Sequence, residues 1–240
     1  MFKTIVFSAF GAGLAVCLAV SALQFVTTEP LILHAEEFEG TAAPEAAATP
    51  IPDAASVHQH ESGAADVHDD EEWGPADGFE RTAYTVLANL VVGFAISLML
   101  LGAMALKGDP IDGRRGLLWG VAGFAAVSLL PALGLPPELP GTPAGDIYDR
   151  QFWWLGAAAA SAAGIALLAF SRNWGFLAAG AALLVAPHVI GAPTPPSHEV
   201  SYPGALAGEF VVASMVVSAV LWSLSGLAAG WLHQRLSRPA

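Results

Sequence analysis

Residues 82–106 read TAYTVLANLVVGFAISLMLLGAMAL and contain no charged side chain. A helix of about 20 apolar residues is long enough to cross the hydrocarbon core of a bilayer. This stretch therefore predicts a membrane-spanning helix. Five further stretches are comparably apolar: 4–28, 115–134, 152–170, 174–192 and 206–232. We expect an all-α, polytopic membrane protein with about six transmembrane helices.

The composition of the whole chain agrees with this class. Of its 240 residues, 55% are hydrophobic and only 12% are charged, as expected for a chain with several long apolar runs. The net charge of −12 argues against nucleic acid as a partner. The single cysteine, Cys17, excludes disulfides and thiolate metal sites within one chain.

The basic residues orient the helices, because cytoplasmic loops carry an excess of Lys and Arg. Six spans with an inside N-terminus place seven of the nine basic residues inside: Lys3, Lys107, Arg114, Arg115, Arg172, Arg235 and Arg238. Both termini are then cytoplasmic. The chain divides into transmembrane helix 1 (1–28), a periplasmic loop (29–80) and a five-helix membrane domain (81–240). The first stretch also has features of a signal peptide, but its long apolar run without a clear cleavage sequence favours a retained anchor.

The outer loop concentrates carboxylates and imidazoles, and between His34 and Glu80 it has no Lys or Arg. Its centre holds the candidate metal ligands His58, His60, His68, Asp69, Asp70, Glu71 and Glu72. Imidazole and carboxylate together suit Co²⁺, Ni²⁺, Zn²⁺ and Cu²⁺, so we expect this segment to collect divalent ions. The alternative is a solvated acidic linker, because residues 40–66 are rich in Ala and Pro and are predicted to form a flexible tether.

Polar residues within the apolar stretches form the second candidate site, since a polar group is costly to bury in a bilayer. His188 follows Pro187 in the outer part of the fifth stretch, and Glu209 lies near the outer end of the sixth. Gln24 and Glu29 fall at a similar depth in the first. We expect His188 and Glu209 to converge on an outward-facing metal site. The alternative is that each side chain is interfacial and solvated. No catalytic constellation or nucleotide-binding motif occurs, so an enzyme is not expected.

Other patterns predict structure and not chemistry. Small residues recur at four-residue spacing, which lets helix backbones approach closely: Gly116 and Gly120, Gly226 and Gly230, and Gly156, Ala160 and Gly164. Asp77 is predicted to cap the second span, with Arg81 within ion-pair reach on the same helix. Asn89 falls near the middle of that span. Trp153 and Trp154 are predicted to lie in the interfacial aromatic belt.

Several segments together resemble the CbtA family of predicted cobalt transporter subunits. They are EEWGPADGFER at 71–81, RRGLLWG at 114–120, PPELPG at 136–141, QFWW at 151–154, PHVIGAP at 187–193 and EF at 209–210. The resemblance implies a bacterial inner-membrane protein that is tied to cobalamin biosynthesis and works with a small single-span partner, CbtB. The family is described with five spans, whereas this sequence supports six.

We therefore expect a membrane subunit that imports Co²⁺, with the outer loop concentrating the ion and no tightly bound cofactor. The ligand types do not distinguish Co²⁺ from Ni²⁺. The alternative is a non-transporting metal-binding or assembly subunit that presents the ion to another permease.

Overall fold

The computed structural model describes residues 2–41, 75–76, 78–108, 110–197 and 199–238. All regular structure in these ranges is helical. The helices are α1 (Phe2–Val26), α2 (Thr28–Thr41), α3 (Phe79–Lys107), α4 (Gly113–Phe124), the π-helix η1 (Ala125–Leu129), α5 (Leu130–Ala132), α6 (Ile147–Phe170), α7 (Trp174–Ile190) and α8 (Gly204–Leu236). The expected all-α class is confirmed.

Five helical segments are long and apolar enough to cross a membrane: α1, α3, the continuous segment Gly113–Ala132, α6 and α8. The sixth expected span is α7, which is apolar but has only 17 residues. At about 1.5 Å per residue it is shorter than the roughly 30 Å hydrocarbon core. The structure therefore confirms a polytopic membrane protein with five spans of sufficient length, and it leaves the count of six unconfirmed.

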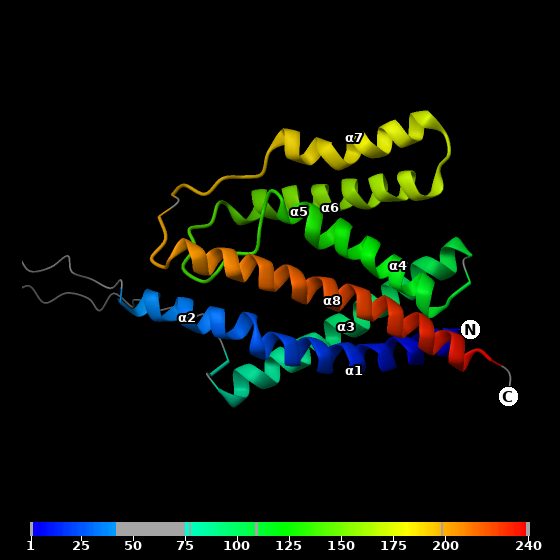
Figure 1. The fold of residues 1–240 in the computed structure, drawn as a ribbon, viewed down its shortest axis with the longest axis horizontal. Coiled ribbons are helices and arrows are strands. Elements are labelled where there is room, and N and C mark those ends of the chain that lie inside the picture. Colours follow the sequence, from blue (N-terminus) through cyan, green and yellow to red (C-terminus); the bar gives the residue numbers. More distant parts are fainter. Residues whose placement is uncertain (1, 42–74, 77, 109, 198, 239–240) are drawn as a thin grey trace, which may run out of the picture.

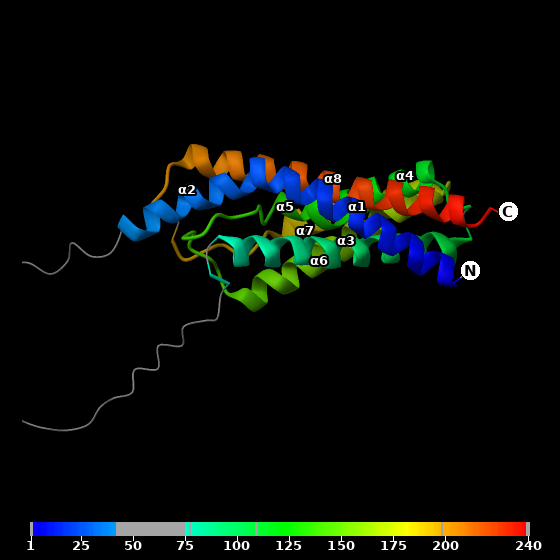
Figure 2. The same cartoon turned by 90° about the horizontal axis from the view of Figure 1, so that it is seen from below.

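The long helices run roughly along one common axis (Figures 1 and 2). Both termini lie at the same end of the bundle, which we call the inner end. The seven basic residues assigned to the cytoplasm belong to helix ends or connections at this end. The opposite end, which we call the outer end, carries α2, the start of α3 and the connections that precede α6 and α8. This arrangement agrees with the expectation that both termini are on one side.

Close backbone approach holds α4 against α8. A Cβ atom on Gly116 would overlap the carbonyl oxygen of Gly226, and one on Gly230 would overlap the carbonyl oxygen of Asp112. The two predicted GxxxG pairs therefore face each other, as proposed from their spacing. The third predicted set of small residues, on α6, forms a helix contact only in part. Gly164 meets the Gly180 carbonyl of α7, whereas a Cβ on Gly156 would touch nothing.

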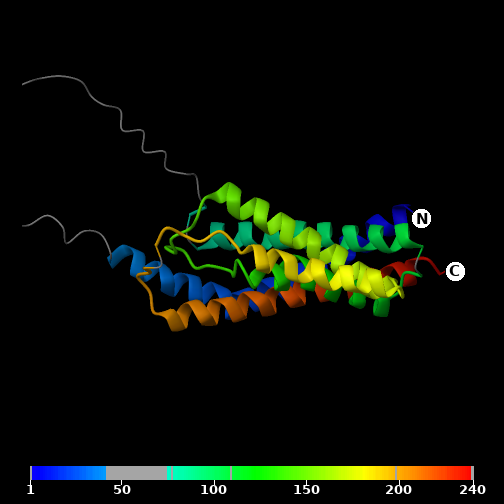
Figure 3. The ribbon, with the colours of Figure 1, turned by 90° about the horizontal axis from the view of Figure 1, so that it is seen from above.

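Around this contact, α1 packs along α3 and α8, and α3 also packs on α8. The buried side chains at their junction come from three helices: Ala9, Ala12, Leu101, Met104 and Ala229. The pair α6 and α7 lies to one side of these four helices and joins them through η1, α5 and α4 (Figure 3). Consequently α7 has one principal neighbour, α6.

A π-helix interrupts the third span. The N–H of Leu130 bonds the carbonyl of Ala125, five residues earlier, and the next residue, Pro131, has no N–H to continue the α-helical ladder. Such π segments are rare and are frequent at functional sites. Here the segment packs against α6 and so shapes the wall between the two parts of the bundle.

The segment assigned to the outer loop starts with a helix that was not predicted from the sequence. Helix α2 runs from Thr28 to Thr41, separated from α1 by a single residue, and Glu29 lies in its first turn. Its apolar face packs on the loop before α6 and on the start of α8: Ala35 lies in one buried cluster with Leu139, Tyr202 and Leu206. Burial of this face explains why a helix forms in an otherwise acidic segment.

Candidate functional site

The outer end neutralises its two arginines with carboxylates. Arg81 forms an ion pair with Glu36, and Arg150 Nη2 lies 2.5 Å from Glu138 Oε2. Within the part of the chain that the structure describes, every basic residue of the outer end is thus paired with an acid. An outer surface without unpaired cations favours the approach of a divalent cation.

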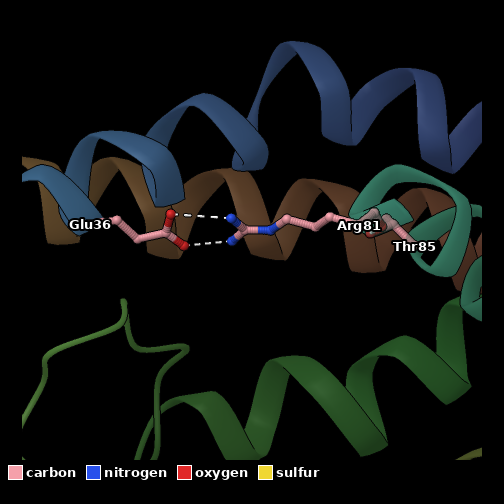
Figure 4. Close-up of polar contacts among 3 residues, drawn as sticks. All are labelled: Glu36, Arg81 and Thr85. Atoms are coloured by element: carbon pink, nitrogen blue, oxygen red, sulfur yellow. Dashed lines mark hydrogen bonds and ion pairs between the residues drawn. The ribbon is translucent and has the colours of Figure 1, made fainter. Parts of the chain in front are cut away.

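Arg81 binds Glu36 with both arms of its guanidinium, at 2.5 Å and 3.2 Å (Figure 4). This pair joins α3 to α2, and the expected contact of Arg81 with Asp77 stays a prediction. The hydrogen bond from Arg81 lowers the pKa of the Glu36 carboxyl; partial burial opposes this shift, and the positive charge of Arg81 adds to it. Asp77 lies outside the described residues, and Gly78 holds the N-cap position of α3.

His188 lies in the last turn of α7, directly after Pro187, which is inside the helix and buried. Its ring meets the indole of Trp153 on α6 edge to face, with 6.1 Å between the ring centroids. Both His188 Nε2 and Trp153 Nε1 are buried, and neither has a hydrogen-bond partner among the described residues. A buried polar atom without a partner costs about 1–3 kcal/mol, so a group that binds His188 Nε2 would remove a penalty.

Trp153 packs differently from its neighbour in the predicted aromatic belt. A Cβ on Gly134 would overlap the Trp153 ring, so the indole is inserted between the end of the third span and α7. Trp154 is more exposed and lines a shallow cavity of about 400 Å³ with Arg150 and Gln151. The prediction of a belt therefore fits Trp154 better than Trp153.

Glu209 does not meet His188 within this chain. Glu209 is an exposed residue in the second turn of α8, and α8 packs on α4, α1 and α3, whereas α7 packs on α6. In Figure 1, α5 and α6 lie between α7 and α8. No group of three or more His, Cys, Asp or Glu side chains suited to a metal occurs in the described ranges.

A separate polar cluster joins α1 to α3 within the membrane-spanning region. The amide nitrogen of Asn89 donates to Ser21 Oγ at 3.0 Å and to Gln24 Oε1 at 2.6 Å. The sequence singled out Asn89 and Gln24 but did not pair them. The pairing could have been predicted, because both amide side chains lie at a similar depth in successive antiparallel helices. Hydrogen bonds of this kind fix helix contacts in membranes.

The acidic and histidine-rich centre of the outer segment lies outside the described residues. This applies to His58, His60, His68, Asp69, Asp70, Glu71 and Glu72, which all fall in 42–74. Their role as ion collectors stays a prediction. The described helices α2 and α3 fix only where this segment leaves and rejoins the bundle, which is the outer end.

The family model described as "Probable cobalt transporter subunit (CbtA)" matches residues 2–234, nearly the whole chain. No curated protein and no solved structure matches it.

Proposed function

Because this chain belongs to the CbtA family of probable cobalt transporter subunits, we propose that it carries Co²⁺ inward across the bacterial inner membrane together with a small single-span partner. The match over residues 2–234 is the observation that carries this proposal, since it covers every described helix except the last two residues of α8. The cobalt would serve cobalamin biosynthesis. Moving a dication inward along the membrane potential is favourable by roughly 4.6 kcal/mol per 100 mV.

His188 is the residue that we assign to first contact with the ion inside the bundle. Its Nε2 atom is buried at the outer end and has no hydrogen-bond partner in the part of the chain that the structure describes. A neutral imidazole nitrogen is a good ligand for Co²⁺ and Ni²⁺. The Trp153 indole packs against this imidazole in an edge-to-face contact. Pro187 has no N–H, so the carbonyl four residues earlier in α7 lacks its usual helical hydrogen bond.

The outer segment would raise the local concentration of the ion. The carboxylates and histidines of 58–72 would bind Co²⁺ weakly and reversibly, and helices α2 and α3 attach both ends of this segment to the outer end of the bundle. Glu209, exposed at the same end, would belong to this collecting surface and not to the His188 site.

A second candidate function is a metal-binding or assembly subunit that does not itself transport. Two observations favour it. The described ranges contain no cluster of three metal-ligating side chains, and α7, which carries His188, has only α6 as a principal neighbour. A second chain placed against α7 would then complete the coordination of the ion.

Uptake of ⁵⁷Co²⁺ into proteoliposomes with an inside-negative potential separates these functions. The transport proposal expects uptake that depends on this chain and rises with the partner. His188→Ala should reduce uptake at least tenfold, whereas His34→Ala, which removes an exposed imidazole at the same end, should leave it unchanged. Deletion of residues 42–70 should raise the apparent KM for Co²⁺.

Each result has a defined alternative. Full uptake by His188→Ala would reject the assigned site. Co²⁺ binding by the purified chain without uptake, with and without the partner, would establish the second function. An unchanged KM after the deletion would show that the outer segment does not concentrate the ion.

A further inference from the structure

A large apolar groove lies at the inner end of the bundle, far from the proposed metal site. It has a volume of about 690 Å³ and runs between α3, α4 and α6, with η1 and Trp222 of α8 contributing to its wall. Most of its lining is aliphatic or aromatic. Only two charged residues line it, Lys107 at the end of α3 and Arg115 in the first turn of α4.

The groove exists because its walls carry small side chains. Helices α3 and α6 both contact α4, but they do not pack extensively on each other. The facing walls hold the alanines Ala103, Ala122, Ala162, Ala166 and Ala169. At the floor, a Cβ on Gly123 would overlap the Trp222 ring, so the indole lies directly on the α4 backbone. Because the side chains on both walls are small and the indole lies flat below them, a narrow channel stays open between the helices.

The two cations lie at one end of this channel and are fixed there. Lys107 Nζ is 4.5 Å from the centroid of the Phe170 ring. One guanidinium nitrogen of Arg115 donates to the Pro110 carbonyl at 3.2 Å, and its Nε is 3.9 Å from the Asp112 carboxylate. Both side chains belong to the end that holds seven of the nine basic residues, which the positive-inside rule places in the cytoplasm.

We propose that this groove binds an anionic phospholipid of the inner leaflet, with an acyl chain between α3 and α6 and the phosphate beside Lys107 and Arg115. The arrangement matches the two parts of such a lipid: an apolar channel along the membrane and a basic mouth at the cytoplasmic interface. Basic pockets between transmembrane helices on this side are the known type of site for anionic headgroups. If an apolar helix of a partner chain filled the groove instead, the charged ends of Lys107 and Arg115 would lie against its apolar side chains, which is costly.

Native mass spectrometry of the delipidated, full-length protein tests the proposal with phosphatidylglycerol and phosphatidylcholine of identical chains. Phosphatidylglycerol should bind at least tenfold more tightly. Lys107→Gln, which leaves the Arg115 contacts with the α3–α4 connection untouched, should weaken its binding about fivefold, and Lys107→Gln/Arg115→Gln should abolish the preference. Ala166→Phe should fill the channel and weaken both lipids while the charges remain.

The matched control is Arg114→Gln/Arg235→Gln, which removes two exposed cations of the inner end that do not line the groove. It should keep the preference for phosphatidylglycerol. The proposal is overturned if the wild-type protein binds both lipids equally, or if the control loses as much affinity as Lys107→Gln/Arg115→Gln. It is also overturned if Ala166→Phe leaves lipid binding intact but releases a co-purified single-span chain, since the occupant would then be a helix. Monodisperse elution and unchanged helicity establish that each variant is folded.

Discussion

Arg81, three residues into the second long helix, holds the carboxylate of Glu36, 45 residues earlier, through two hydrogen bonds from one guanidinium. The pair joins α2 to α3, the two helices that flank the acidic outer segment. It therefore fixes both attachment points of that segment relative to each other at the outer end.

Removing this pair should loosen the outer end without unfolding the bundle. The side chains are about one-third exposed, so Glu36→Gln is expected to cost about 1 kcal/mol, at the upper end of values for surface pairs because the geometry is two-pronged. Unfolding of the purified protein in detergent would measure the loss. Glu37→Gln removes the neighbouring, exposed carboxylate and is the matched control. An equal loss in both variants would show that net charge, and not the pair, is responsible.

The same pair predicts a response to acid. The pKa of Glu36 is lowered, chiefly by the hydrogen bond from Arg81, so folding favours the ionised carboxylate. Its stabilisation is complete above the ordinary glutamate pKa of about 4.3 and is lost as the pH falls through the lower folded-state pKa. The free energy of unfolding should therefore fall more steeply on acidification in the wild type than in Glu36→Gln. Parallel pH profiles for the two proteins would contradict this.

Contact between α4 and α8 should not tolerate a single added methyl group. Gly226→Ala would drive its Cβ into the Gly116 carbonyl, and overpacking of this kind typically costs 1–3 kcal/mol or more. A lowered Tm and reduced yield of monodisperse protein should follow. Gly156→Ala is the control, because its Cβ meets nothing and alanine favours the helix by about 1 kcal/mol. An equal fall in Tm for both variants would contradict this, because it would mean that Gly156 is also packed closely against another helix.

The polar contact between α1 and α3 should be structural. Asn89→Leu removes two hydrogen bonds, to Ser21 and Gln24, each worth roughly 0.6 kcal/mol in a membrane protein. The Tm should fall modestly, and Co²⁺ uptake per folded molecule should stay at the wild-type level. Ser21→Ala, which removes one of the two bonds, should lose about half as much. Loss of uptake in a fully folded Asn89→Leu protein would instead place this amide on the ion path.

Much of the fold could be predicted because apolar length and glycine spacing are local properties. The stretch 82–106 lies within α3, and the stretch 206–232 lies within α8. The contact made by the GxxxG pairs could also be predicted, since this spacing is typical of helices that approach closely. Helix α2 was missed although Leu31, Ala35 and Phe38 have the i, i+4, i+7 spacing of a helix face. The acidic residues between them masked that signal.

The candidate site was less predictable, because its contacts join residues that are distant in the sequence. His188 was identified as a costly polar group in an apolar stretch, but its packing on Trp153 depends on how α7 lies along α6. The expected convergence with Glu209 assumed that similar depth means proximity. Similar depth fixes only the position of a residue along the membrane normal. Its position in the membrane plane depends on the order of the helices around the bundle.

The sequence by itself determined which segments are apolar enough to enter the membrane and which end carries the positive charge, since burial in a bilayer requires apolar runs and the positive-inside rule counts residues. Tertiary structure alone decided which helix lies beside which. That choice paired Arg81 with Glu36 and Asn89 with Gln24. It also opened the groove between α3 and α6 by holding both helices apart on α4. Interhelical packing and hydrogen bonds act between residues far apart in the chain, and no local pattern records them.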